Sequence, residues 1–169
     1  MAVRTAPQNV TTVRSHQSAV TANDVGMLVL RLGLGIIFFL HGSQKVFGWF
    51  GGHPLDQSVA AMAAMHIAAP LAYLSILTEF LGGIALILGV LSRIAGIGLT
   101  INMIVAIALV HFKNGFFMMG GPKGPGYEYN IALIAMALAV AIAGPGSISI
   151  ADWEGRLLGA ERPTKYPEG

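Results

Sequence analysis

The sequence contains no cysteine among its 169 residues. Without thiols the chain cannot exchange disulfides, hold an iron–sulfur cluster or form a structural disulfide. Charged residues are also scarce, at 11%, where soluble domains usually carry about 25%. The ten Lys and Arg residues are spread singly along the chain and form no basic patch, so no nucleic-acid partner is expected.

What the chain has in abundance is apolar surface. Hydrophobic residues make up 54% of the sequence, and its mean hydropathy is +0.68. The length suits one domain of roughly 100 to 200 residues, which leaves no room for a separate catalytic domain beside a membrane part. The composition therefore predicts one compact unit whose main solvent is the lipid bilayer.

Four segments are apolar enough to predict membrane-spanning helices, since a crossing needs about 20 such residues. They are residues 24–46, 70–91, 94–112 and 127–143, of which the last has the shortest uninterrupted apolar run. Only Ser92 and Arg93 join the second segment to the third, so these two helices are expected to be antiparallel neighbours. The predicted fold is an all-α polytopic membrane protein, a four-transmembrane-helix up-down bundle over residues 24–146.

The segments around these helices are more polar. Residues 1–23 are expected to form a loosely ordered tail, and residues 147–169 an amphipathic segment and tail. The connection Phe47–Ala69 is too polar to span, and we expect a short interfacial helix at Ala60–Ile67 within it. Six Lys and Arg residues lie on the side of both termini and three on the other side, which predicts cytoplasmic termini.

Two ionisable residues fall inside the predicted helices, Arg31 and Glu79. An ionisable group at mid-bilayer costs at least about 2.5 to 3.5 kcal/mol, so each needs an explanation. Counted from the cytoplasmic helix ends, Arg31 lies roughly 10 Å deep and Glu79 roughly 18 Å deep, a gap that a long arginine can bridge. Three interpretations follow: a buried Arg31–Glu79 pair that fixes helix register, a site where Glu79 passes a proton, or two unrelated residues.

Further polar residues gather at the predicted outer ends of the helices. His41 and Lys45 end the first helix, His111 ends the third, and Glu128 and Asn130 open the fourth. They are candidates for substrate binding, although Glu128 also suits a helix N-terminus and His111 an interfacial anchor.

One polar residue of the third helix sits apart from this set. Asn102 lies nine residues before His111, hence on the opposite side of a regular helix, so the two cannot share a pocket without a kink. No two histidines have the spacing of a helical metal site, and no metal is expected.

Several motifs occur in an order that resembles a known family. They are Arg31 with Leu32 and Gly33, FLHGSQKVFG at Phe39–Gly48, Glu79 with Gly82 and Gly83, Leu88 and Gly89 followed by Arg93, YEYN at Tyr127–Asn130, and GPGSISIAD at Gly144–Asp152. From about Val25 to Trp153 the chain resembles the DoxX family of small four-helix bacterial membrane proteins, which is related to the DoxD subunit of thiosulfate:quinone oxidoreductase. The matching polar residues are Arg31, His41, Lys45, Glu79, Glu128 and Asn130.

The resemblance implies a multi-pass component of a redox system in the bacterial plasma (inner) membrane. We expect a pocket that opens outward between the first, second and fourth helices and binds a quinone or a small substrate, with no covalently bound cofactor. His41 and Lys45 would bind its oxygen atoms, and Glu79 with Arg31 would relay a proton.

Such a pocket supplies no electron donor, so a partner protein with haem, flavin or a metal is expected, and a homo-oligomer is compatible. Whether the chain is a catalytic subunit of a quinone-linked oxidoreductase stays open. The alternatives are a non-catalytic accessory or assembly subunit and a small proton-coupled transporter.

Overall fold

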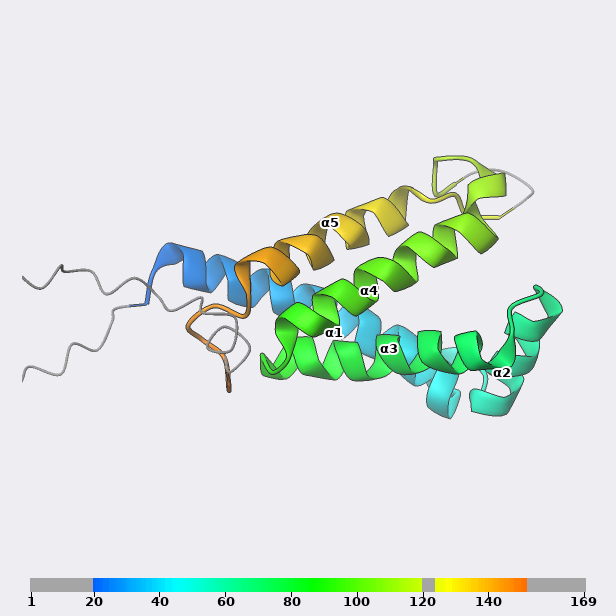
Figure 1. The fold of residues 1–169 in the computed structure, drawn as a ribbon, viewed down its shortest axis with the longest axis horizontal. Coiled ribbons are helices and arrows are strands. Elements are labelled where there is room, and N and C mark those ends of the chain that lie inside the picture. The colour runs from blue at the N-terminus through cyan, green and yellow to red at the C-terminus, as the bar shows by residue number, and fades with distance from the viewer. Residues whose placement is uncertain (1–19, 120–123, 152–169) are drawn as a thin grey trace, which may run out of the picture.

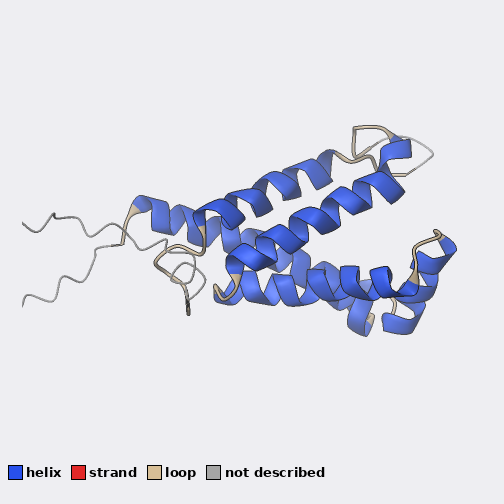
Figure 2. Ribbon diagram, in the orientation of Figure 1, coloured by secondary structure: helices blue, strands red, loops and turns tan. Residues whose placement is uncertain are grey.

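The computed structural model describes residues 20–119 and 124–151 (Figure 1). Within these residues about 77% of the chain is helical and no strand is formed, as Figure 2 shows. The predicted all-α fold is thereby confirmed. Predictions for most of the N-terminal tail, and for the chain after residue 151, lie outside the described residues.

The helices follow one another with short connections. Their order is α1 (Ala22–Phe47), the 3₁₀ turn η1 (Trp49–Gly51), α2 (Leu55–Ala64), α3 (Ala69–Leu88), α4 (Ser92–Ala106), the π-helical segment η2 (Ile107–His111), the 3₁₀ turn η3 (Phe112–Asn114) and α5 (Glu128–Ala143). In the part of the chain that the structure describes, three stretches are long and apolar enough to cross a membrane, namely α1, α3 and the continuous Ser92–Asn114. At 16 residues, α5 is shorter than the roughly 20 of a typical crossing.

The short helix in the first long connection begins earlier than the sequence indicated. It starts at Leu55 directly after Pro54, where the extended backbone gives way to helix, and the Ser58 hydroxyl donates to the His53 carbonyl at 2.8 Å. It ends at Ala64, and His66 then takes a left-handed backbone conformation with φ +63°. This turn, rather than the run of alanines, decides where the helix stops.

The bundle consists of two closely packed helix pairs. In one pair α1 packs on α3, in the other α4 packs on α5, and α3 and α4 are the expected antiparallel neighbours. Glycines make the close contacts possible: a Cβ at Gly42 would lie 2.5 Å from Cα of Phe80, and one at Gly96 would lie 2.7 Å from the Ala137 carbonyl oxygen. Such small residues are how helices approach each other in lipid, where no hydrophobic effect drives their packing.

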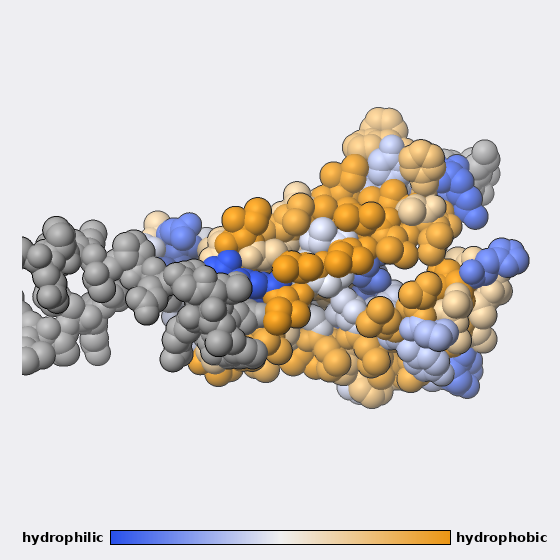
Figure 3. Space-filling view, in the orientation of Figure 1, coloured by the Kyte–Doolittle hydropathy of each residue, from blue (hydrophilic) through white to orange (hydrophobic). Residues whose placement is uncertain are grey.

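The two pairs meet at one end of the bundle and diverge at the other (Figure 1). At the closed end the Ser147 amide donates to the Asp24 carboxylate at 2.7 Å, and the Ile150 amide donates to the Leu88 carbonyl at 3.2 Å. The start of α1, the α3–α4 turn and the chain after α5 therefore lie together. At the open end Figure 3 shows a notch between the pairs, with hydrophilic residues on both sides of it.

Large apolar side chains cover the outside of the bundle. Val29, Leu74, Ile94 and Ile142 are among the many that are more than half exposed. Figure 3 shows this apolar surface over the middle of the molecule. An apolar patch of this extent is unsuited to water and suited to acyl chains, so the protein contacts the lipid bilayer.

Candidate functional site

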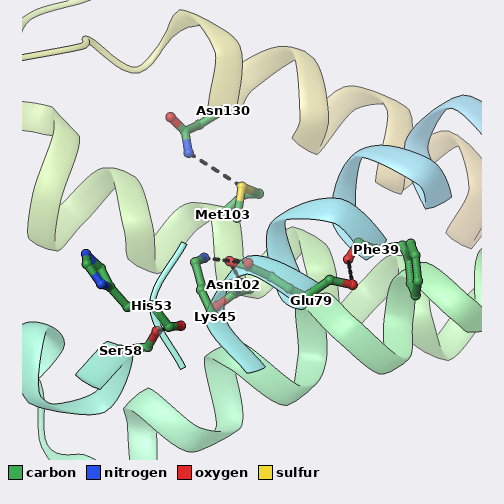
Figure 4. A network of polar contacts seen from close by, with 9 residues as sticks. Phe39, Lys45, His53, Ser58, Glu79, Asn102, Met103 and Asn130 are labelled. Carbon is green, nitrogen blue, oxygen red and sulfur yellow. Dashed lines mark hydrogen bonds and ion pairs between the residues drawn. The ribbon is translucent and has the colours of Figure 1, made fainter. Parts of the chain in front are cut away.

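A buried carboxylate lies where α1, α3 and α4 meet. Glu79 of α3 is only 4% exposed, and its Oε2 atom lies 2.5 Å from Nζ of Lys45 on α1. Its other oxygen, Oε1, accepts a hydrogen bond of 3.2 Å from the Asn102 amide on α4. Figure 4 shows these side chains brought together from three helices. Both carboxylate oxygens thus have a donor, which is the condition for keeping a charge away from water.

The register of α1 against α3 explains why Lys45 is the partner. Gly42 lies against Phe80, and Gly35 lies against Gly83 and Ile87 in the same antiparallel pairing. The same pairing places Lys45 opposite Leu77, two residues from Glu79, so the long lysine side chain can reach the carboxylate. A register fixed by glycine contacts therefore also fixes the ion pair.

The predicted contact between Arg31 and Glu79 is not formed. Arg31 lies 14 residues before Lys45 on α1, which is about 21 Å along the helix axis, and it reaches the far end of α3. There its guanidinium donates to the carbonyl oxygens of Pro145 at 3.2 Å and Ile148 at 2.8 Å. The depths estimated from the helix ends did not take the register of α1 against α3 into account. They therefore placed Arg31 and Glu79 closer together than they are.

The two arginines at the closed end hold the chain after α5. Arg93 donates to the carbonyls of Ala141, Ile142 and Ala143 at 3.0, 2.5 and 3.3 Å, and so caps the last turn of α5. Arg31 binds the carbonyl oxygens of Pro145 and Ile148, which follow in the chain. Arg31 therefore binds the chain at the closed end and lies away from the Glu79 site.

An inner cavity of about 390 Å³ lies beside Glu79 between the helix pairs. Its walls come from α1, α3, α4, η2, α5 and the loop before α5. They include Phe38, His41, Lys45, Glu79, Met103, Ala106, His111, Met118, Pro125, Gly126, Tyr129, Asn130 and Leu133. The structure thus brings together five of the seven site residues expected from the sequence, namely His41, Lys45, Glu79, His111 and Asn130.

The remaining outer candidate, Glu128, does not line this cavity. It is the first residue of α5, and its backbone amide donates to the Phe116 carbonyl at 2.9 Å. A carboxylate in that position favours the helix N-terminus, which is the structural interpretation of this residue.

A second, lateral cavity of about 500 Å³ lies between α2, α3 and α4. Its lining is mostly apolar, and it shares Lys45, Glu79, Ala106 and His111 with the inner cavity. The Lys45–Glu79 pair therefore stands in the wall between two cavities.

The π-helical segment Ile107–His111 explains how Asn102 and His111 can line the same cavity. In a regular helix, Asn102 and His111 are two and a half turns apart and point in opposite directions. The wider turn of the π-helix changes this phase, and both residues line the lateral cavity. Single π turns of this kind occur frequently at functional sites. His111 is then held in place by a 3.1 Å contact between its Nδ1 atom and the Pro125 carbonyl oxygen.

Sequence reasoning missed three residues of the site. Asn102, the only amide within its apolar stretch, was noted in the sequence, but its helical phase relative to His111 set it apart from the other site candidates. Tyr129 and Met103 gave no such signal, because an aromatic or a methionine at helical spacing is more often a core residue. Met103 accepts a 3.5 Å hydrogen bond from the Asn130 amide at its sulfur (Figure 4).

The inner cavity combines hydrogen-bond donors with apolar walls. Lys45 supplies an ammonium, His41 and His111 supply imidazoles, and Phe38 and Leu133 are almost fully buried apolar walls. This arrangement suits a flat ligand with carbonyl or anionic oxygens. Within residues 20–119 and 124–151, no group of three or more His, Asp or Glu side chains is placed to hold a metal ion.

Comparison with known proteins identifies relatives of this chain. A family model described as DoxX matches residues 26–112. "Putative oxidoreductase CatD" of Bacillus subtilis is 30% identical over 117 residues, which are 69% of this chain and 79% of that protein. "Inner membrane protein YqjF" of Escherichia coli is 32% identical over 127 residues, which are 75% of this chain and 90% of that protein. No solved structure matches.

Proposed function

Because this chain belongs to the DoxX family, we propose that it is a bacterial inner-membrane component of a redox system that binds a quinone or another small substrate beside Glu79. The observation that carries this proposal is the buried Glu79, held by Lys45 and Asn102 in the wall of a cavity with further donors. A buried, paired ionisable group inside a membrane domain marks a functional site by default. The relative named as an oxidoreductase supports the redox class.

The proposal includes four membrane crossings with both termini in the cytoplasm. Although α5 has 16 residues, it returns the chain to the end where α1 begins, and Ser147 binds Asp24 there. A chain that starts and finishes at one end of a bundle crosses it an even number of times. The relative named as an inner membrane protein supports this location.

The residues present fit a quinone. The inner cavity falls within the roughly 300 to 1,000 Å³ of typical small-molecule sites. Lys45 and His111 would hold the ring oxygens, and Phe38 and Leu133 would contact the ring. A quinone, when bound, supplies a carrier that takes up electrons and protons together. Catalytically, Glu79 and Lys45 would hold a proton between Oε2 and Nζ, next to the bound ring.

The chain itself shows no electron donor among its described side chains, so the proposal requires a partner protein. That partner would carry haem, flavin or a metal and would dock on the membrane-embedded bundle or at its outer end. If the protein is instead an accessory subunit, the Lys45–Glu79 pair serves only to join α1 to α3.

The test compares the wild type with Glu79→Gln and Glu128→Gln. Both variants replace a carboxylate by an amide of the same size, but only Glu79 lines the cavity. Each protein is purified from native membranes in mild detergent, bound quinone is extracted and measured, and quinone reduction is assayed in the isolated complex. We expect bound quinone in the wild type and in Glu128→Gln, and at least about a 10²-fold loss of turnover in Glu79→Gln at equal complex yield.

Three other outcomes contradict the proposal. Loss of complex without loss of turnover per complex assigns Glu79 to assembly. Proton-coupled flux in liposomes that contain this protein alone favours a transporter. Absence of quinone in a purified, intact wild-type complex removes the quinone from the proposal.

A further inference from the structure

The two cavities on either side of the Lys45–Glu79 pair differ in character. The inner cavity combines the donors of the site with buried apolar residues such as Phe38 and Leu133. The lateral cavity is walled by apolar residues that are also exposed on the outside of the bundle: Leu71, Leu74, Ile101, Val105 and Leu109. The lateral cavity therefore opens on the surface that contacts acyl chains, and water is not its natural occupant.

The two cavities are continuous in their lining. Lys45, Glu79 and His111 contribute to both, and so does Ala106, whose methyl group is the smallest side chain in the shared wall. A polar group held at Lys45 thus has the mostly apolar lateral cavity directly beside it, between α3 and α4. Gly98 and Thr78 both line the lateral cavity, and a Cβ at Gly98 would lie only 3.3 Å from Cγ2 of Thr78, so a larger side chain at this position would crowd the cavity wall.

The other approach to Glu79, from the open end of the bundle, passes the loop before α5. Met118, Pro125 and Gly126 line the inner cavity from the loop before α5, and that loop is fastened at both of its described ends. The Gly126 amide donates to the Phe117 carbonyl at 3.1 Å, and Asn114 donates to the Pro125 carbonyl at 3.0 Å. None of these three loop residues lines the lateral cavity, so a ligand that enters there from the bilayer does not pass the loop.

We propose that the substrate is an amphiphile that enters sideways from the bilayer between α3 and α4, with its polar head at Lys45 and Glu79 and its long apolar chain in the lateral cavity. This inference rests on the proposed function in placing the head beside Glu79, and it adds the substrate class and the route. The chain occupying the cavity belongs to the substrate itself. A separate bilayer lipid filling the same cavity is an outcome that the test distinguishes.

The test narrows the lateral cavity and leaves the head site unchanged. Val105→Trp places a large side chain at its wall, and Ile104→Trp is the matched control, because Ile104 is a similarly exposed neighbour on α4 that lines neither cavity. Proteins in lipid nanodiscs are titrated with a decyl-substituted benzoquinone, the same ring without the chain, and a dansyl-labelled fatty acid. Binding is counted as the excess over empty nanodiscs.

In the wild type we expect the decyl quinone to bind at least about tenfold more tightly than the chainless ring, since each methylene removed from water adds affinity. Val105→Trp abolishes this preference and leaves binding of the chainless ring within about twofold, whereas Ile104→Trp changes neither. If Val105→Trp does not fold, Ile101→Trp blocks the same wall.

The remaining outcomes separate this inference from the proposed function. If both quinones bind equally well and Val105→Trp has no effect, the redox site stands and the lateral route is wrong. If only the fatty acid binds, and Val105→Trp weakens it, the lateral route stands and the quinone is wrong. If the fatty acid binds alongside the decyl quinone without displacing it, a bilayer lipid occupies the lateral cavity. If no probe binds, both proposals fail.

Discussion

Nζ of Lys45 lies 2.5 Å from Oε2 of Glu79, so a partly exposed cation on α1 neutralises a carboxylate buried in α3. The side chain of Lys45 is 29% exposed and that of Glu79 is 6% exposed. The carboxylate therefore depends on the lysine, and on Asn102, far more than the lysine depends on it. This asymmetry has consequences for stability.

Replacing Lys45 by Met is expected to lower the free energy of unfolding by about 2 kcal/mol, because it leaves Glu79 buried without its charged partner. Replacing both residues, Lys45→Met with Glu79→Leu, is expected to restore most of this loss, since an apolar pair needs no hydrogen bonds. The measurement is unfolding in mixed micelles with increasing SDS, read as a double-mutant cycle. A single Lys45→Met variant as stable as the wild type would show that water or lipid headgroups replace the lysine.

The register that forms this pair depends on Gly42. A Cβ there would lie 2.5 Å from Phe80 Cα, whereas a Cβ at Gly33 on the same helix would meet nothing within 4 Å. We expect Gly42→Ala to destabilise the protein by about 1 to 3 kcal/mol and to weaken the α1–α3 contact, and Gly33→Ala to stay within about 0.5 kcal/mol of the wild type. SDS unfolding of the two variants checks this. Equal changes in the free energy of unfolding for Gly42→Ala and Gly33→Ala would mean that α1 can move away from α3 without loss of stability.

Much of the fold follows from composition and spacing alone. The apolar stretches indicated helices, and the cost of a charge in lipid singled out Glu79 before any neighbour was known. Four of the other polar residues at the outer helix ends, namely His41, Lys45, His111 and Asn130, also meet at the inner cavity, because helices that start and stop at the same depth bring their ends together.

The pairing of these residues did not follow from the sequence. Whether Glu79 faces Lys45 or Arg31 depends on how far α3 slides along α1, and that is set by backbone contacts at Gly42 and Gly83. Periodicity gives the face of a helix but not its axial offset. The π-helical segment Ile107–His111 is likewise a local change of hydrogen-bond pattern that no residue type predicts, and it changes the helical phase between Asn102 and His111, which line the same cavity.

Arg31 is expected to act at the closed end of the bundle. Arg31→Leu removes its hydrogen bonds to the carbonyls of Pro145 and Ile148 and should loosen the chain after α5. Because the protein has no native cysteine, Ser149→Cys provides a single labelling site in that segment. We expect maleimide to label Ser149→Cys several-fold faster in the Arg31→Leu background than in the wild-type background.

A control residue at the open end gives this experiment its specificity. Phe117→Cys lies in the loop before α5, far along the bundle from Arg31, and its labelling rate should not change. Faster labelling at both positions would indicate general unfolding, and an unchanged rate at Ser149→Cys would assign the closed end to Arg93 and Asp24 instead.

The absence of cysteine also makes the topology directly measurable. If α5 crosses the membrane, Phe117 and Ile150 lie on opposite sides, and Val20 lies on the side of Ile150. All three side chains are exposed. In intact spheroplasts, a membrane-impermeant maleimide should label Phe117→Cys, whereas Ile150→Cys and Val20→Cys should react only after the membrane is permeabilised. The cysteine-free parent controls for background. Labelling of Phe117→Cys and Ile150→Cys from the same side would show that α5 does not cross, and would leave three spans with the termini on opposite sides.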